Sequence, residues 1–162
     1  MKKIELDAMD LQILEQLQRD ASLSNQDLAQ AVHTSAPTCL RRIKRMRDAG
    51  LIERQIAILN PEQLALSIGH GLCAIVEITL DRQGAEELAR FEARVLGDAA
   101  VQQCYQVSPG PDFVLVVHTA HMPAYQALVQ RLFTSDANVR NVKAFFSVKR
   151  SKFGAELPLH SV

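Results

Sequence analysis

The chain contains the stretch Ser35-Ala-Pro-Thr-Cys-Leu-Arg-Arg-Ile-Lys-Arg-Met-Arg-Asp-Ala-Gly50, and both of its ends carry helix boundary signals. Ser35 is a residue type that caps a first helical turn with its hydroxyl. Pro37 is tolerated near a helix start because its missing N–H is not needed there. Gly50 supplies the left-handed residue at which helices commonly end. The stretch therefore predicts a helix between Ser35 and Gly50.

The predicted helix has two different faces when it is drawn at 100° per residue. One side is a narrow apolar stripe of Cys39, Ile43 and Met46, which suits packing against a core. The other side is basic, and five of the seven residues from Arg41 to Arg47 are cationic. Because the whole chain balances 18 basic against 18 acidic residues, this positive charge is local rather than general.

A basic cluster of this kind is often no more than a solvated helix face. A surface that follows phosphate groups needs unpaired cations, and only Asp48 lies nearby in sequence to neutralise them. We therefore expect the basic face to be unpaired and to meet a negatively charged partner.

Two further helices are predicted before the basic one. Asp7 and Asp10 resemble a capping box at the start of a helix that runs from about Ala8 to Asp20. Ser24 repeats this start signal for a short helix that ends near residue 32, so only two residues separate it from the cap of the basic helix at Ser35. So tight a connection is the helix-turn-helix arrangement, in which the basic helix enters the DNA major groove. The order of helices thus favours DNA binding over an unrelated three-helix bundle.

The second half of the chain alternates between strand and helix periods. It follows a β-prone linker strand or small wing at 51–59, a short helix capped by Asn60-Pro61, and a glycine-rich break at Gly69-His70-Gly71. The elements then follow the order βαββαβ, which predicts a ferredoxin-like antiparallel sheet with two helices on one face. The other face would present Ile75 and Phe145 to water, so we expect a homodimer that covers it.

The expected fold class is therefore α+β. An N-terminal helix-turn-helix domain of winged-helix-like type is joined by a linker strand to a C-terminal ferredoxin-like βαββαβ domain. The predicted divisions are 1–60 for the helix-turn-helix domain, 61–71 for the linker, 72–150 for the ferredoxin-like domain and 151–162 for a C-terminal tail.

Other kinds of chemistry have few candidate residues. No apolar run approaches the roughly 20 residues of a membrane helix, so we expect a cytoplasmic protein without a membrane partner. Cys39, Cys73 and Cys104 are odd in number and widely spaced, which implies no disulfide framework. His118 and His121 lack nearby acidic or cysteine ligands, so we expect no metal. No phosphate-binding glycine loop or nucleophile motif occurs, and we expect neither a cofactor nor an enzyme.

Four groups of residues along the chain together match the pattern of a known protein family. They are Leu6-Asp7…Asp10…Ile13-Leu14…Leu17-Gln18-Arg19-Asp20, Ser24-Asn25…Leu28-Ala29, Ser35…Pro37-Thr38-Cys39-Leu40-Arg41-Arg42-Ile43-Lys44-Arg45-Met46, and Gly50-Leu51-Ile52 with Leu59-Asn60-Pro61. In these residues the chain resembles the leucine-responsive/asparagine-responsive (Lrp/AsnC) family of bacterial and archaeal transcription regulators. That family pairs a helix-turn-helix with a ferredoxin-like domain that dimerises and binds small effectors, usually amino acids, between dimers. The resemblance implies double-stranded DNA and an amino-acid effector as partners, and assembly to an octamer as a tetramer of dimers.

The DNA-binding residues expected from the basic helix are Ser35, Pro37, Thr38, Arg41, Arg42, Lys44 and Arg45. The cationic side chains would contact phosphates or guanine edges, and Pro37 and Thr38 would lie at the reading tip. In a dimer, two such helices would occupy successive major grooves about 34 Å apart.

By the same resemblance, the effector pocket is lined by the turn between the second and third strands and by the last strand. The implied residues are Tyr105, Ser108, Pro109, Gly110, Asp112, Met122, Phe145 and Ser147. Turn amides can hold a carboxylate and Asp112 can take an ammonium group, while capping of the turn is the alternative role of Asp112. The family turn commonly reads Gly-acidic-x-Asp-Tyr, whereas this turn reads Pro109-Gly110-Pro111-Asp112-Phe113 and its prolines remove two amide donors.

The sequence therefore predicts a sequence-specific DNA-binding transcriptional regulator whose activity is modulated by a small effector bound between dimers. The alternative is a metabolic sensor or scaffold that does not bind DNA. It would regulate a protein partner through its ferredoxin-like domain and use the basic helix as a protein-docking face.

Overall fold

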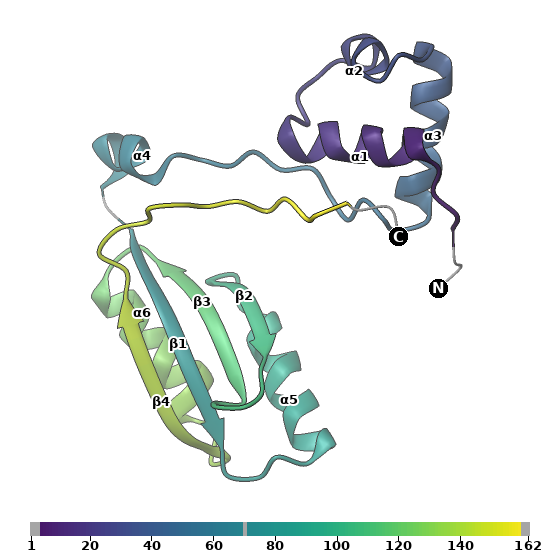
Figure 1. Ribbon diagram of the computed structural model, residues 1–162. Helices are drawn as coiled ribbons and strands as arrows, with labels where there is room; N and C mark the ends of the chain where they lie inside the picture. The colour runs from purple at the N-terminus through teal and green to yellow at the C-terminus, as the bar shows by residue number, and fades with distance from the viewer. Residues whose placement is uncertain (1–3, 70, 160–162) are drawn as a thin grey trace. The chain divides into compact units, whose positions relative to one another are not determined.

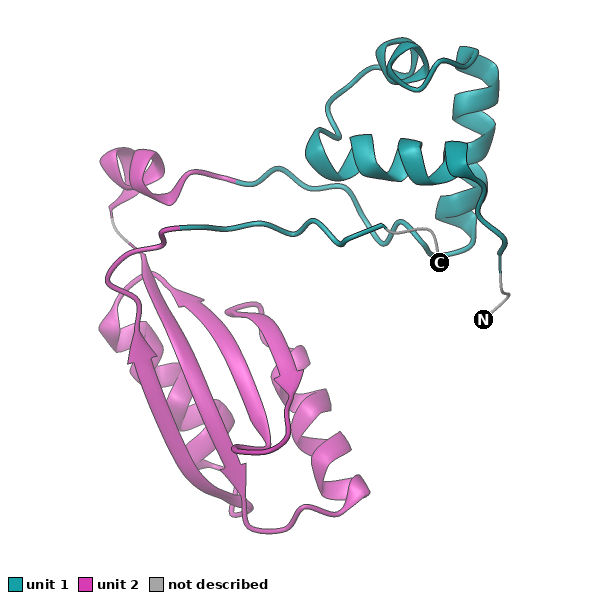
Figure 2. Cartoon of the chain, viewed as in Figure 1, with its two compact units in different colours: residues 1–58, 152–162 teal, residues 59–151 magenta. Residues whose placement is uncertain are grey.

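A computed structural model of the chain describes residues 4–69 and 71–159, so His70 of the predicted glycine-rich break lies outside the described residues. The chain divides into two compact units, which are Met1–Ile58 with Lys152–Val162, and Leu59–Ser151 (Figure 2). This division differs from the predicted one at both boundaries. The segment expected as a linker belongs with the sheet, and the C-terminal tail belongs with the N-terminal helices.

The N-terminal unit is built from helices α1 (Ala8–Arg19), α2 (Asn25–Ala31) and α3 (Ala36–Asp48) (Figure 1). The predicted start signals are confirmed. Asp7 and Asp10 form a capping box, and the serines at positions 24 and 35 accept hydrogen bonds from the third residue of their helices. The chain reverses after α3 at a glycine with φ of 75°, at position 50.

The three helices pack around one apolar core. Its buried members are Ile13, Leu28, Ala29, Val32, Cys39, Ile43 and Met46. The predicted apolar stripe of α3 is therefore confirmed, and burial raises the pKa of the Cys39 thiol above its usual value. Because this stripe faces the core, the basic side of α3 faces away from it.

The segment after α3 differs from one expectation. Residues 51–59, where the sequence predicts a linker strand or small wing, form no strand in the described part of the single chain. A β-prone composition becomes a strand only when a neighbouring strand supplies ladder hydrogen bonds. Here Ile56 and Ile58 are exposed instead. Helix α4 (Pro61–Ile68) follows and is capped by Asn60, as predicted.

The second unit holds a four-stranded antiparallel sheet in the order β2-β3-β1-β4. The strands are β1 (Leu72–Leu80), β2 (Val101–Gln106), β3 (Phe113–Thr119) and β4 (Val139–Phe146). Helix α5 (Ala85–Leu96) and helix α6 (Met122–Val129), which continues as the π-helical turn η1 (Gln130–Thr134), lie on one face of this sheet (Figure 1). This is the predicted ferredoxin-like arrangement.

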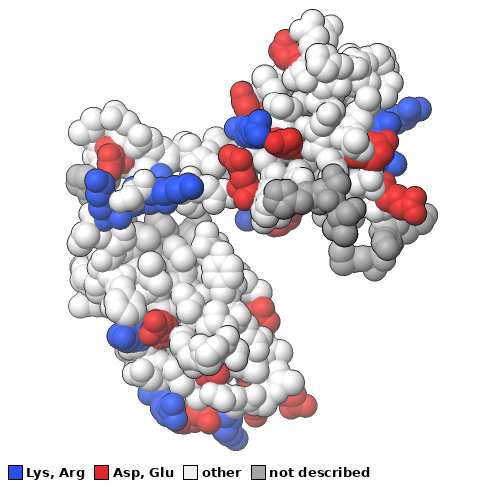
Figure 3. Space-filling model, viewed as in Figure 1, with Lys and Arg blue, Asp and Glu red and all other residues white. Residues whose placement is uncertain are grey.

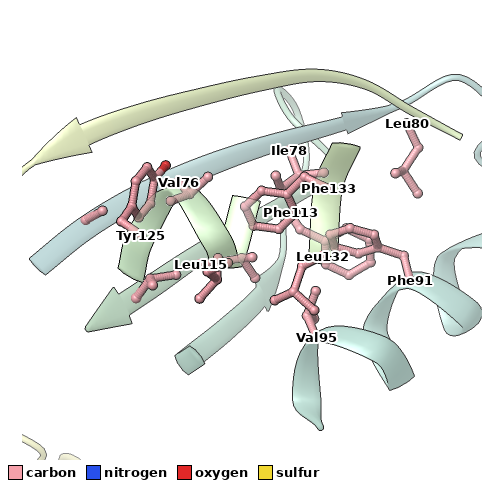
Figure 4. Close-up of a cluster of buried hydrophobic side chains, with 13 residues drawn as sticks. Val76, Ile78, Leu80, Phe91, Val95, Phe113, Leu115, Tyr125, Leu132 and Phe133 are labelled. Atoms are coloured by element: carbon pink, nitrogen blue, oxygen red, sulfur yellow. The ribbon is translucent and has the colours of Figure 1, made fainter. Parts of the chain in front are cut away.

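The core of the second unit lies between the sheet and its helices (Figure 4). Alternate residues of β1 and β3 point into it, and the rings of Phe91 and Phe113 lie 4.9 Å apart between their centroids. On the opposite face, Ile75 is in register with both Val116 and Phe145. Ile75 and Phe145 are each 44% exposed. The apolar face that the sequence predicts is thus uncovered in the single chain.

No helix within 4–69 or 71–159 is both long and apolar enough to cross a membrane.

Truncation of a core leucine tests the assigned core. Leu128→Ala is expected to lower the free energy of unfolding of the second unit by about 2 to 5 kcal/mol, because the side chain is fully buried and its loss leaves a cavity. Leu96→Ala is the matched control, since Leu96 is 63% exposed and its truncation should cost less than about 0.5 kcal/mol. Urea unfolding followed by circular dichroism measures both losses. Equal losses in the two variants would contradict the assignment.

Candidate nucleic-acid interface and effector site

The solvent side of α3 carries two free cations. Arg41 and Lys44 are exposed, and neither is paired with an acidic side chain in the part of the chain that the structure describes. Pro37 lies one turn before Arg41 on the same side and is also exposed. At the start of the helix, the Ser35 hydroxyl donates to Thr38 Oγ1 at 2.9 Å, so these two side chains hold the first turn. The helix α3 thus combines a fixed start with positive charge on its solvent side.

Arg42 and Arg45, by contrast, are bound by carboxylates of α1. Arg42 Nη1 donates to Asp7 Oδ2 at 2.7 Å and to Asp10 Oδ1 at 2.9 Å. Arg45 Nη2 donates to Asp10 Oδ2. The Asp10 side chain has no exposed surface, whereas the Asp7 side chain is 56% exposed. We call Asp7, Asp10, Arg42 and Arg45 the arginine-carboxylate network.

The contact between Asp7 and Arg42 favours the charged form of both groups. The Asp10 backbone N–H, together with the Arg42 guanidinium, holds the pKa of Asp7 below its usual value. Hydrogen bonds from Arg42 to Asp10 and Asp7 raise the pKa of Arg42 in turn. Asp7 and Arg42 are therefore both ionised at neutral pH.

The expectation of an unpaired basic face is therefore wrong at Arg42 and Arg45. Asp7 and Asp10 lie 35 and 32 residues from Arg42 in the sequence, and they reach it because α1 and α3 share one core. Sequence reasoning assigned the two aspartates to the helix cap and missed this second role. On the face seen in Figure 3, acidic and basic side chains of the N-terminal unit lie next to one another.

An open hollow lies at the surface of the network. It is lined by Asp7, Arg41, Arg42 and Arg45. The hollow brings one free guanidinium and two paired ones to a single solvent-accessible place. The four cations Arg41, Arg42, Lys44 and Arg45 and the two carboxylates give this region a net charge of 4 − 2 = +2.

The residues implied for the effector pocket lie in two groups at opposite ends of the sheet. The turn group comprises Tyr105, Ser108, Pro109, Gly110 and Asp112, and the strand-end group comprises Met122, Phe145 and Ser147. The Leu80 N–H, at the end of β1, donates to Asp112 Oδ2 at 2.6 Å. The Ser147 N–H donates to the Cys73 carbonyl, near the start of β1, at 2.9 Å. The seven-residue separation along β1 is about 23 Å at the rise of a strand, so one chain does not bring the two groups together.

The Asp112 side chain accepts a hydrogen bond from the end of β1 rather than from the amides of its own turn. Besides accepting the Leu80 N–H, it donates its own N–H to the Ile78 carbonyl at 2.8 Å and accepts the Val107 N–H at 3.1 Å. In the single chain this residue therefore ties the turn to the end of β1. Gly110, at φ of 129°, and Tyr105 remain exposed in the same group.

The described histidines and cysteines have structural rather than metal-binding surroundings. His121 Nδ1 accepts the Ala124 N–H at 3.1 Å and so caps α6. Burial, followed by the charge of Arg150, lowers the pKa of His118, and burial raises the pKa of Cys73. Within 4–69 and 71–159, no cluster of three or more histidine, cysteine or acidic residues is placed to hold a metal ion.

Two protein-family models match the chain, one over the N-terminal helices and one over the sheet and part of the C-terminal tail. A model described as winged helix-turn-helix DNA-binding matches residues 6–53. A model described as Lrp/AsnC ligand binding domain matches residues 73–157, which is more than half of the chain.

Known proteins match over nearly the whole length. The leucine-responsive regulatory protein of Rhizobium meliloti is 32% identical over 97% of this chain and 98% of its own. The Bkd operon transcriptional regulator of Pseudomonas aeruginosa is 34% identical over 96% and 99%. A crystal structure of an AsnC family transcriptional regulator from Agrobacterium tumefaciens has a TM-score of 0.81 at 31% identity and covers 94% of this chain and 97% of its own. A transcriptional regulator from Neisseria meningitidis in complex with L-methionine has a TM-score of 0.80 at 29% identity, with coverage of 95% and 97%.

Removal of the buried carboxylate tests the structural role of the network. Asp10→Ala is expected to lower the free energy of unfolding of the N-terminal unit by about 2 to 4 kcal/mol, because it leaves Arg45 without a carboxylate partner and Arg42 with only Asp7. Glu15→Ala is the control, since it breaks an exposed pair with Arg19 on the same helix and should cost less than about 1 kcal/mol. Thermal unfolding compares the two variants. A loss for Asp10→Ala no larger than that of the control would show that the network does not hold α1 against α3.

Proposed function

The chain belongs to the Lrp/AsnC family of DNA-binding transcriptional regulators, and we propose on that premise that α3 is the helix that enters the DNA major groove. The observation that carries this assignment is the free charge of Arg41 and Lys44 on the solvent side of α3. Phosphate contacts need cations of this kind. The helix tip, with Pro37 and Thr38, leads into the groove, where the first residues of a recognition helix meet base edges.

The other members of the expected DNA-binding set take different parts in this proposal. Ser35 fixes the helix start through its bond to Thr38. Arg45 is half exposed and has one carboxylate partner, so it adds a phosphate or guanine contact at the edge of the face. Arg42 has two carboxylate partners and little exposure, and its part in the proposal is to position α3 against α1.

We propose further that the protein acts as a homodimer in the cytoplasm and assembles to an octamer, a tetramer of dimers. The uncovered sheet face with Ile75, Val116 and Phe145 supports the dimer, because apolar surface of this kind is buried in self-association. Two-fold symmetry then sets the α3 helices one DNA turn, about 34 Å, or a multiple of it apart. The proposed activity is binding alone, without catalysis.

The effector proposed for the C-terminal domain is a small molecule of the amino-acid class. Its support is the match of 73–157 to a ligand-binding domain and the likeness to a regulator in complex with L-methionine. The turn group and the strand-end group are too far apart to form one pocket in a single chain. We therefore place the site between copies, where the turn group of one chain meets the strand-end group of another. Binding there changes how the copies sit together, and so the spacing of the DNA-binding helices.

The DNA proposal is tested by the salt dependence of binding. Arg41→Ala is expected to lower the slope of log affinity against log salt by about one unit, because one phosphate contact is lost. Arg19→Ala is the matched control, since Arg19 is an exposed arginine on α1 and should leave the slope unchanged. Fluorescence anisotropy on a labelled fragment of the protein's own promoter region measures both.

Two outcomes would count against the assignment. An Arg41→Ala protein with unchanged affinity and slope would mean that α3 is not the DNA-contacting element. A wild-type protein that fails to bind the promoter fragment would favour the scaffold alternative, for which the pairing of Arg42 and Arg45 is the supporting observation.

The effector proposal is tested by calorimetry on oligomers of two variants. Titration of the wild-type protein with the common amino acids, L-methionine included, is expected to release or absorb heat. Ser108→Trp and Ser147→Trp, both at exposed positions, should each abolish that heat by blocking one group. Mixed oligomers from co-expression should regain part of it, because some sites then combine two unaltered groups. No heat for the wild-type protein at millimolar concentration, or no recovery in the mixture, would contradict a site between copies.

A further inference from the structure

We propose that Asp7 competes with DNA phosphates for Arg42 and thereby limits the sequence-independent part of DNA binding. This inference rests on the proposed role of α3 in the major groove. It assigns to an acidic residue outside α3 a direct effect on how strongly the basic face attracts DNA.

The position of Asp7 supports a role at the surface. Its carboxylate lines the same hollow as Arg41 and Arg45, and more than half of its side chain is exposed. It accepts a hydrogen bond from Arg42 Nη1 at 2.7 Å. A phosphate that approaches Arg42 through this hollow must displace a carboxylate of like charge, and like charges at such short range repel each other.

Asp7 is not needed to hold Arg42 in place. The same Nη1 atom also donates to the buried Asp10 at 2.9 Å, and Asp10 binds Arg45 from its other oxygen. The buried carboxylate of Asp10 thus holds both arginines from the protein interior, whereas the exposed carboxylate of Asp7 binds Arg42 on the solvent side. Removing the charge of Asp7 alone would leave the Asp10 contacts and expose one more cation to DNA.

The expected consequence follows from how proteins bind DNA without regard to sequence. That affinity depends on the number of phosphates that cations neutralise, and each one adds about 0.9 to the salt slope. A cation released from Asp7 therefore adds at most about one unit. If the proteins with and without the Asp7 charge bind equally at 1 M salt, a slope steeper by about 0.5 to 0.9 gives a gain in affinity of about three- to eightfold at 0.1 M salt.

Asp7→Asn removes the charge of the carboxylate without removing the helix cap that the side chain provides. Asp7 Oδ1 accepts the Asp10 N–H at 2.9 Å and so caps α1, and an asparagine oxygen caps a helix as well as an aspartate oxygen does. The exchange keeps the cap and removes the charge that pairs with Arg42. Asp7→Ser is a second variant, because serine also caps but is too short to cover the guanidinium.

Glu15→Gln is the matched control. It also raises the net charge by one and also frees an arginine, Arg19, from a pair at 2.6 Å. Arg19 lies at the far end of α1, about 18 Å from Asp7 at the rise of an α-helix. Any effect of net charge alone would therefore appear equally in both variants.

The experiment is fluorescence anisotropy of the full-length protein with a labelled duplex of mixed sequence, at several salt concentrations. Asp7→Asn is expected to bind about three- to eightfold more tightly at 0.1 M salt, with a slope steeper by up to about one unit. Glu15→Gln should behave as wild type. In an Arg42→Ala background, the gain from Asp7→Asn should shrink to that of the control.

Two other outcomes would contradict either the inference or the proposed function. If the wild-type protein binds with a measurable salt slope and both Asp7 variants bind no more tightly, or Glu15→Gln gains as much, the competition at Arg42 is refuted while the proposed function stands. If the wild-type protein binds neither this duplex nor its promoter fragment, the proposed function fails and the inference falls with it. Circular dichroism of each variant identifies any that has not folded.

Discussion

A carboxylate without any exposed surface, that of Asp10, is the interaction on which the N-terminal unit depends. A buried charge is costly unless it is paired and hydrogen-bonded. Asp10 meets this requirement with two arginines that lie almost one turn apart on α3. Its position in the first turn of α1 fixes where that turn must lie along α3. The orientation of the basic helix is therefore set by charge as well as by the shared apolar core.

Under the proposed function, the pairing that stabilises the N-terminal unit reduces the attraction of the same arginines for DNA. An arginine that neutralises a buried carboxylate is held in one place, but the carboxylate offsets part of the positive charge that the arginine presents to solvent. Arg41 and Lys44 have no such partner in the described residues and keep their full charge for solvent. A chain whose total charge is zero can thus present a modest local excess of positive charge, and the proposed role of Asp7 concerns the size of that excess.

The parts of this structure that sequence predicts well are those that depend on near neighbours. Three features arise from residues that are close together in the sequence: the cap formed by Asp7 and Asp10, the apolar stripe of α3 that includes Cys39, and the alternation along β1. Their patterns can therefore be recognised from the sequence alone. The segment 51–59 forms no strand in the described chain because a strand there needs a hydrogen-bonding partner that the sequence does not identify. The pairing of Arg42 was missed for a similar reason, since its carboxylates come from another helix. Each difference concerns a contact between distant segments, which only the fold defines.

The residues proposed for the effector site depend on contacts between chains as well as on contacts between segments. Register along β1 fixes Asp112 at one end of the sheet and Ser147 at the other, and no rearrangement of side chains can close that distance. The exposed face with Ile75 likewise lacks a cover within its own chain. The proposed pocket uses residues from both ends of the sheet, so we propose that it is complete only where two copies meet. Under this proposal, binding of the small molecule changes how the copies assemble, and the assembly sets the positions of the DNA-binding helices. Ligand binding and DNA binding are then coupled through the contacts between copies rather than within one chain.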